Sequence, residues 1–337
     1  MKYAFDSGRW SATESWRTIR TVRAEPPAAI APTLKGERRV VFQAALEQAQ
    51  QQFAAAAAVG YESRALNLFY GLSQAGRALA AASDRLGPGM ADDNAKRWQS
   101  TSHGLAFALT QGDFWHERVK VEAGRSDTFT RTSIALGSSY DFESIELGAL
   151  AAQIPEFAME WRTFDHWPRS LNVDDSMGDW ANGVFDLREY RGAVSLAALE
   201  EYVGHYPALH PVAIPLGGDG LPADRTGDGL YYTMVARPED YLHRPRKLLS
   251  GARPYGGSYF VFPQPDGASG DLHPLMAWWQ LLFGFSILAR YHPKQWTEAL
   301  AIGTSPIASQ IEFLLDAAVA AVPELLAREW WEPPTGW

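Results

Sequence analysis

A run of residues that is apolar on nearly every face, residues 274–291, restricts the fold of this chain more than any other feature. It contains two adjacent tryptophans, two phenylalanines and four leucines or isoleucines in its central part, with no acidic residue and a single arginine. A helix that is apolar all round belongs in a protein interior or in a bilayer. The run is shorter than the roughly 20 residues that a bilayer span needs. We therefore expect a buried helix that other elements must cover.

Three further segments have the pattern of helices, and they lie on both sides of the middle of the chain. Residues 37–58 are rich in Ala and Gln, which favour helices. Residues 62–83 and 305–329 carry apolar side chains at steps of three and four. We expect these helices to form one helical core built from the N- and C-terminal segments.

The middle of the chain changes to the alternating, β-branched pattern of strands. Residues 104–110 are compatible with a helix or a strand, and residues 144–164 return to helical spacing. The segments that the alternation predicts as strands are 119–122, 129–136, 183–187, 230–236 and 258–263.

These patterns predict a mainly α fold with a small β insert, an α+β fold. The prolines at 26, 27 and 32 interrupt any helix near the N-terminus, so we expect an irregular arm there. The predicted parts are an N-terminal arm at 1–35, a helical segment at 36–112, a mixed α/β insert at 113–269 and a C-terminal helical segment at 270–337 that packs on 36–112.

Composition removes several classes of function. The 337 residues include no cysteine, which excludes thiolate nucleophiles, disulfides and Cys-based metal sites. The histidines and carboxylates match no zinc spacing, so we expect no metal and no cofactor. The net charge of −9 opposes broad binding to phosphate backbones unless a local basic patch overcomes it.

The first ten residues lack the apolar region of an export signal. We therefore expect a cytoplasmic protein without a membrane-spanning segment.

The two strongest helices share a pattern: an aromatic residue, Gly, an apolar residue, Ser, three uncharged residues and Arg. It places Ser73 with Arg77, and Ser286 with Arg290, on one helix face each. One interpretation is two polar clusters that face each other or share an anion. The alternative is close helix packing, in which each arginine caps a helix or pairs with an internal carboxylate.

Residues 68–79, 102–105 and 285–296 resemble the bacterial YaaC-like proteins, and the resemblance extends from about residue 37 to residue 329. It implies a cytoplasmic protein and brings no established activity with it.

A more distant likeness is to the HEPN helical domains, whose catalytic members are metal-independent ribonucleases with an Arg and a His a few residues apart. Arg97 and His103 have five residues between them. The resemblance implies that His103 acts as a general acid or base, while Arg97 or Arg77 stabilises a phosphate. The alternative is that Ser102 caps a short helix and His103 forms a hydrogen bond across the loop.

The strongest local basic patch in this acidic chain lies at Arg244, Arg246 and Lys247, with Tyr241 and Tyr259 nearby in the sequence. Charge and stacking there suit a phosphate, a nucleotide or a short single strand. A solvated loop that offsets neighbouring acids is the alternative.

Together these features favour a binding or interaction module for a nucleotide or RNA-like ligand. One alternative is a HEPN-like ribonuclease with His103 and Arg97 as catalytic residues, and another is a structural subunit with a homo-oligomer or protein partner. The sequence does not decide whether the protein is an enzyme. The predicted ligand-binding residues are Ser73, Arg77, Ser286, Arg290, Tyr291, Arg244, Arg246 and Lys247.

Overall fold

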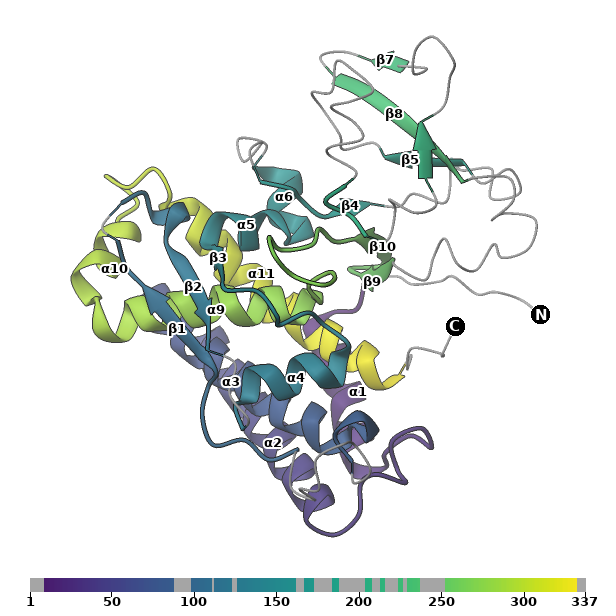
Figure 1. Ribbon diagram of the computed structural model, residues 1–337. Helices are drawn as coiled ribbons and strands as arrows, with labels where there is room; N and C mark the ends of the chain where they lie inside the picture. Colours follow the sequence, from purple (N-terminus) through teal and green to yellow (C-terminus); the bar gives the residue numbers. More distant parts are fainter. Residues whose placement is uncertain are drawn as a thin grey trace.

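The structure of the chain, a computed structural model, is mainly helical with a small β part, as the sequence predicts (Figure 1). The residues that it describes are 9–87, 98–110, 112–122, 126–161, 167–172, 184–187, 204–207, 213–215, 224–226, 229–236 and 252–331.

The core consists of helices from both ends of the chain, which confirms the predicted helical core. Helix α3 packs against α2, α9 and α11, and the side chains of α9 from its first residue to Ser286 are buried. The bounds of these helices are α2 Glu37–Ala58, α3 Tyr61–Ala82, α9 Pro274–Tyr291 and α11 Ala308–Trp331. The short helix α10 (Pro293–Ala299) follows α9 and packs against it.

A glycine permits the close approach of α3 and α9. A Cβ atom on Gly76 would clash with the ring of Trp279, so only glycine fits at this position without displacing the tryptophan. The rings of Phe69 and Phe283 meet at the same interface, 5.4 Å apart between centroids. The glycines of the shared sequence pattern, Gly71 and Gly284, accommodate side chains of other elements instead.

Residues 128–136 form a helix, α4 (Thr128–Leu136), and the predicted strand at 129–136 is wrong. The side chain of Asp127 caps this helix, because its Oδ1 accepts a hydrogen bond of 2.6 Å from the Thr130 N–H. Gly137 ends the helix in the left-handed conformation at φ 66°. The two caps and burial against α3 outweigh the β-branched alternation.

The predicted irregular arm contains a helix, α1 (Ala12–Ala24), so that part of the prediction is wrong. Ser11 and Glu14 form a reciprocal capping box at its start. Its apolar side chains Ile19 and Val22 are buried, and α1 packs along α11. The prolines expected to interrupt a helix lie after its end.

The described strands form small antiparallel sheets. Residues 104–110 contain a strand, so Ser102 does not cap a helix. Residues 144–164 contain one strand and the short helices α5 (Leu147–Ala152) and α6 (Pro155–Glu160). One sheet has the order β1-β2-β3, the second β4-β10-β9, and the third β5-β8-β6 with β7 paired to β8. The strands are β1 Leu105–Ala108, β2 Arg118–Val121, β3 Ser144–Glu146, β4 Leu171–Asn172, β5 Val184–Leu187, β6 Ala213–Pro215, β7 Asp224–Thr226, β8 Gly229–Ala236, β9 Arg253–Tyr255 and β10 Ser258–Val261.

The sheet β1-β2-β3 bears on the site because β1 and β2 pack against α9. The segment before β1, residues 98–104, therefore lies close to the α3–α9 pair (Figure 1). Within the described part of the chain, no helix combines the length and the apolar character needed to cross a membrane.

Candidate functional site

Three basic side chains from three separate segments lie near one surface of the α3–α9 pair. Arg77 lies on α3, Arg290 lies in the last turn of α9, and His103 lies in the loop before β1. The His103 ring is 5.6 Å from the ring of Phe69 on α3, and the Arg290 guanidinium is 5.9 Å from the ring of Tyr70. We call these three residues the basic cluster.

The helical repeat places the α3 members of this surface together. Tyr70, Ser73 and Arg77 are three and seven residues apart, so they share one face of α3. Arg77 is exposed and Tyr70 is half-buried. This face therefore presents an aromatic ring at one end and a guanidinium group at the other.

Close packing against the start of α4 holds the loop that carries His103. Gly104 has φ +80°, and a Cβ atom there would clash with the side chain of Asp127. The backbone N–H of Phe129 donates to the carbonyl of His103 at 3.2 Å. His103 is exposed as a residue, although its ring lies against Phe69, and its backbone carbonyl is bonded to α4.

The electrostatics of the cluster favour an anion. Partial burial lowers the pKa of His103 below its ordinary value of 6.5, and the positive charges of Arg290 and Arg77 lower this pKa further. Among the described residues, no acidic side chain contributes to the shift, and neither arginine forms an ion pair. At neutral pH the surface thus carries two guanidinium charges beside a neutral imidazole.

Tyr291 orients the Arg290 side chain. Its Nη2 donates a hydrogen bond of 2.7 Å to the Tyr291 hydroxyl, and its guanidinium lies 4.8 Å from the Tyr291 ring. Tyr291 is 61% exposed, so one large aromatic surface next to the basic cluster is open to solvent.

The two serines of the shared sequence pattern lie beneath this surface. The hydroxyl of Ser286 donates to the carbonyl of Phe283 on its own helix at 2.8 Å, and the residue is fully buried. Ser73 is 4% exposed. Their predicted contact with a ligand stays a prediction, and we leave Ser286 out of the basic cluster because it has no access to solvent.

The remaining predicted site residues, Arg97, Arg244, Arg246 and Lys247, lie outside the described residues. Their roles stay predictions. No group of three or more histidine or acidic side chains that could hold a metal occurs within the described ranges.

Comparison with models of protein families shows the family to which this chain belongs. The model of the family described as YaaC-like Protein matches residues 13–330. The chain belongs to the YaaC-like family. The match runs from α1 to α11 and includes all three members of the basic cluster. Comparisons with curated proteins and with solved structures gave no match.

A second histidine of this YaaC-like chain was not singled out by the sequence patterns. His273 precedes α9 and caps it, because its Nδ1 accepts a hydrogen bond of 3.1 Å from the Leu275 N–H. Its Nε2 lies 3.0 Å from Glu329 Oε1 on α11. Burial lowers the pKa of His273, which therefore binds Glu329 as the neutral Nε2–H form. A histidine directly before the Pro274 start of an apolar helix is the sequence signal for this cap.

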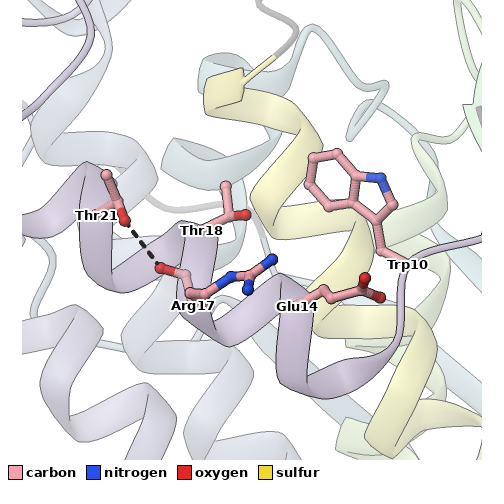
Figure 2. A pocket seen from close by; sticks show the side chains of 5 residues that line it. All are labelled: Trp10, Glu14, Arg17, Thr18 and Thr21. Carbon is pink, nitrogen blue, oxygen red and sulfur yellow. Dashed lines mark hydrogen bonds between the residues drawn. The ribbon is translucent and has the colours of Figure 1, made fainter.

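A shallow depression of about 390 Å³ lies beside α1 (Figure 2). Its lining is Trp10, Glu14, Arg17, Thr18 and Thr21. The Thr21 hydroxyl donates to the backbone carbonyl of Arg17 at 3.2 Å, which is the dashed line in Figure 2. Four of its five lining residues come from one face of the single helix α1, so this depression does not bring polar groups together from separate elements.

Proposed function

We propose that the protein is a binding module for a nucleotide or RNA-like ligand, and that Arg77, His103 and Arg290 bind its phosphate. One observation carries this proposal: Arg290 on α9 and His103 in the loop before β1 lie against Tyr70 and Phe69, neighbouring residues of α3, and Arg77 shares the α3 face of Tyr70. Guanidinium groups bind phosphate oxygens through paired hydrogen bonds, and a protonated imidazole adds a further donor.

The lack of a carboxylate partner among the described residues supports a ligand over a structural role. Several other arginines in the described part of the chain lie beside an acidic partner, as in the pairs Arg64–Asp316, Arg253–Asp271 and Arg328–Glu324. Arg77 and Arg290 form no such pair there. Like charges repel at short range, so an anion that binds between them relieves a cost that the folded chain otherwise bears.

The test is binding of a panel of nucleotides and short oligonucleotides to the purified full chain, measured by thermal shift and then by titration. Arg77→Ala and Arg290→Ala should each weaken binding about ten-fold or more, since each removes hydrogen bonds to a charged group. Arg20→Ala is the matched control, because Arg20 is an exposed arginine on α1 that forms no ion pair with a described residue.

Binding that is equally strong in all three variants would contradict the proposed site. A panel without any binder would contradict the proposed function. Thermal denaturation of each free variant shows whether a loss of binding reflects a loss of folding.

One observation favours a second candidate function, metal-independent RNA cleavage. His103 is neutral at neutral pH, so it is able to accept a proton from an attacking hydroxyl, and two guanidinium groups beside it would stabilise charge on the phosphate. RNA cleavage in the presence of a metal chelator, abolished by His103→Ala, would support this activity. Absence of cleavage, or cleavage unchanged by His103→Ala, would reject it.

A further inference from the structure

Among the described residues, the cations that flank the basic cluster on α3 and beyond α9 have acidic partners. The next arginine toward the start of α3, Arg64, pairs with Asp316, and Lys294 beyond α9 lies 3.9 Å from Glu298. A groove for a nucleic acid strand needs cations repeated along the backbone path. The described surface around the cluster does not continue in that way, and the chain as a whole carries a net charge of −9. These features suit one phosphate group better than a strand.

A terminal phosphate monoester and the phosphodiester of a nucleic acid strand differ in charge and in the number of unesterified oxygens. A terminal monoester has three unesterified oxygens and a charge of about −1.5 to −2 near neutral pH, because its second pKa is about 6. A diester has two such oxygens and a single charge. The cluster offers three donor groups, one each from α3, from α9 and from the loop before β1, and this number matches the three oxygens of a monoester.

We infer, resting on the proposed function, that the basic cluster selects the terminal phosphate monoester of a mononucleotide, with His103 taking up a proton as the ligand binds. The proton gives His103 a positive charge and a second N–H donor. The bound dianion then faces three cations, whereas the free site carries two.

The groups that face His103 decide the direction of this proton transfer. Arg77 on α3 and Arg290 on α9 both disfavour the charged imidazole in the free protein. At the start of α4, Asp127 is 1% exposed, and its Oδ1 accepts the hydrogen bond from Thr130. A bound dianion adds negative charge beside the imidazole and so raises the pKa of His103, which is lowered in the free protein.

The aromatic surface beside the cluster suits the nucleoside part. Tyr291 is 61% exposed, and Arg290 lies 4.8 Å from its ring. A base that stacks on an aromatic side chain gains binding free energy with little dependence on base identity. Tyr291 adjoins Arg290 in sequence, so a nucleotide of ordinary size reaches both the ring and the guanidinium.

Isothermal titration of the full chain near neutral pH tests this inference. The probes are the four nucleoside 5′-monophosphates, inorganic phosphate, adenosine 3′,5′-cyclic monophosphate and a short RNA without terminal phosphates. We expect a 5′-monophosphate to bind about ten-fold or more tightly than the cyclic diester, because it offers one more unesterified oxygen and a larger negative charge. Titration in two buffers of different ionisation enthalpy should show net proton uptake by the protein.

His103→Gln should abolish the proton uptake and weaken binding of the monophosphate about ten-fold, while Arg20→Ala should change neither. Equal affinity for monoester and diester, or proton uptake that persists in His103→Gln, would overturn the inference. If the RNA without terminal phosphates binds and the monophosphates do not, the inference is wrong and the proposed function stands. If no probe binds, both are wrong.

Discussion

At each end of helix α9 a histidine lies next to charged residues, and the two histidines differ in burial and in their partners. At the N-terminal end, His273 is buried, and both of its ring nitrogens have partners, the Leu275 N–H and Glu329. At the C-terminal end, His103 is exposed, and its charged neighbours are Arg77 and Arg290.

The difference separates a polar group that stabilises the fold from one that is available to a ligand. Buried polar groups are satisfied internally, and the loss of one partner leaves the other with an uncompensated desolvation cost. The exposed cluster of one sign has no carboxylate partner among the described residues, so an anion that binds there lowers its free energy. The predictions below test this contrast, beginning with the largest expected effect.

Removal of His273 should destabilise the fold far more than removal of His103. His273→Ala takes away the cap of α9 and leaves Glu329 without its buried hydrogen-bond partner, so we expect a loss of about 3 kcal/mol in the free energy of unfolding. His103→Ala should cost less than about 1 kcal/mol, as is usual for an exposed side chain. Urea denaturation measures both, and equal losses would contradict the contrast.

The interface between α3 and α9 should not tolerate a single added methyl group. In Gly76→Ala the new Cβ clashes with the Trp279 ring and with the Thr132 hydroxyl, so these side chains or the helices that carry them must shift, at an expected cost of about 2 kcal/mol in the free energy of unfolding. Gly303→Ala is the matched control, because nothing lies within 4 Å of the position of its Cβ. If thermal or chemical denaturation gives similar values for the two variants, the packing at Gly76 is not as close as the structure shows.

Stability should fall when the protein is acidified below pH 6.5, the ordinary pKa of histidine. The pKa of His273 is lower in the folded state than in the unfolded state, so the unfolded chain takes up the proton first and is favoured as the pH falls. The stability that neutral His273 contributes is fully present above pH 6.5. It is lost as the pH falls from 6.5 to the pKa of His273 in the folded protein, at up to about 1.4 kcal/mol per pH unit.

His273→Asn keeps a capping oxygen and removes the titrating ring, so it should flatten this decline between about pH 7.5 and about pH 5.5. The free energy of unfolding measured across that range checks the prediction. A decline of the same slope in wild type and variant would assign it to other groups.

Ser286→Ala should have the smallest effect in this series. Its hydroxyl is bonded within α9 and has no access to solvent, so the variant should lose about 1 kcal/mol or less of stability and keep its nucleotide affinity. A fall in nucleotide affinity as large as that expected for Arg77→Ala would show that Ser286 belongs to the binding site.

The long helices were predictable from sequence because their signals are local and agree with their burial. The predicted ranges 37–58 and 274–291 coincide with α2 and α9, and α3 differs from the predicted 62–83 by one residue at each end. In these segments the apolar stripe, the helix propensity and the packing all favour the same structure.

Residues 128–136 show why the alternating sequence pattern led to a wrong prediction of a strand. Thr, Phe and Ile at alternating positions favour a strand, but the segment is buried against α3, and the caps at Asp127 and Gly137 define a helix. The capping box of Ser11 and Glu14 similarly predicts the missed helix α1. Both signals were present in the sequence, and the β-branched or proline-rich surroundings obscured them.

The candidate site was predictable in part. Arg77, His103 and Arg290 are recognisable from the shared helix pattern and from the loop motif, but their approach to one another depends on the crossing of α3 and α9 at Gly76. The burial of Ser286 and the absence of a carboxylate partner among described residues also depend on packing between distant segments. Local sequence patterns do not report such contacts.

The pKa of His103 tests the central claim most directly, because the claim is that Arg77 and Arg290 act on this one imidazole. Titration of its ring protons by NMR in the free protein should give a pKa below 6.5, and Arg77→Ala and Arg290→Ala should each move that pKa back toward 6.5. A pKa at or above 6.5 that neither substitution changes would show that the three side chains do not form one basic cluster.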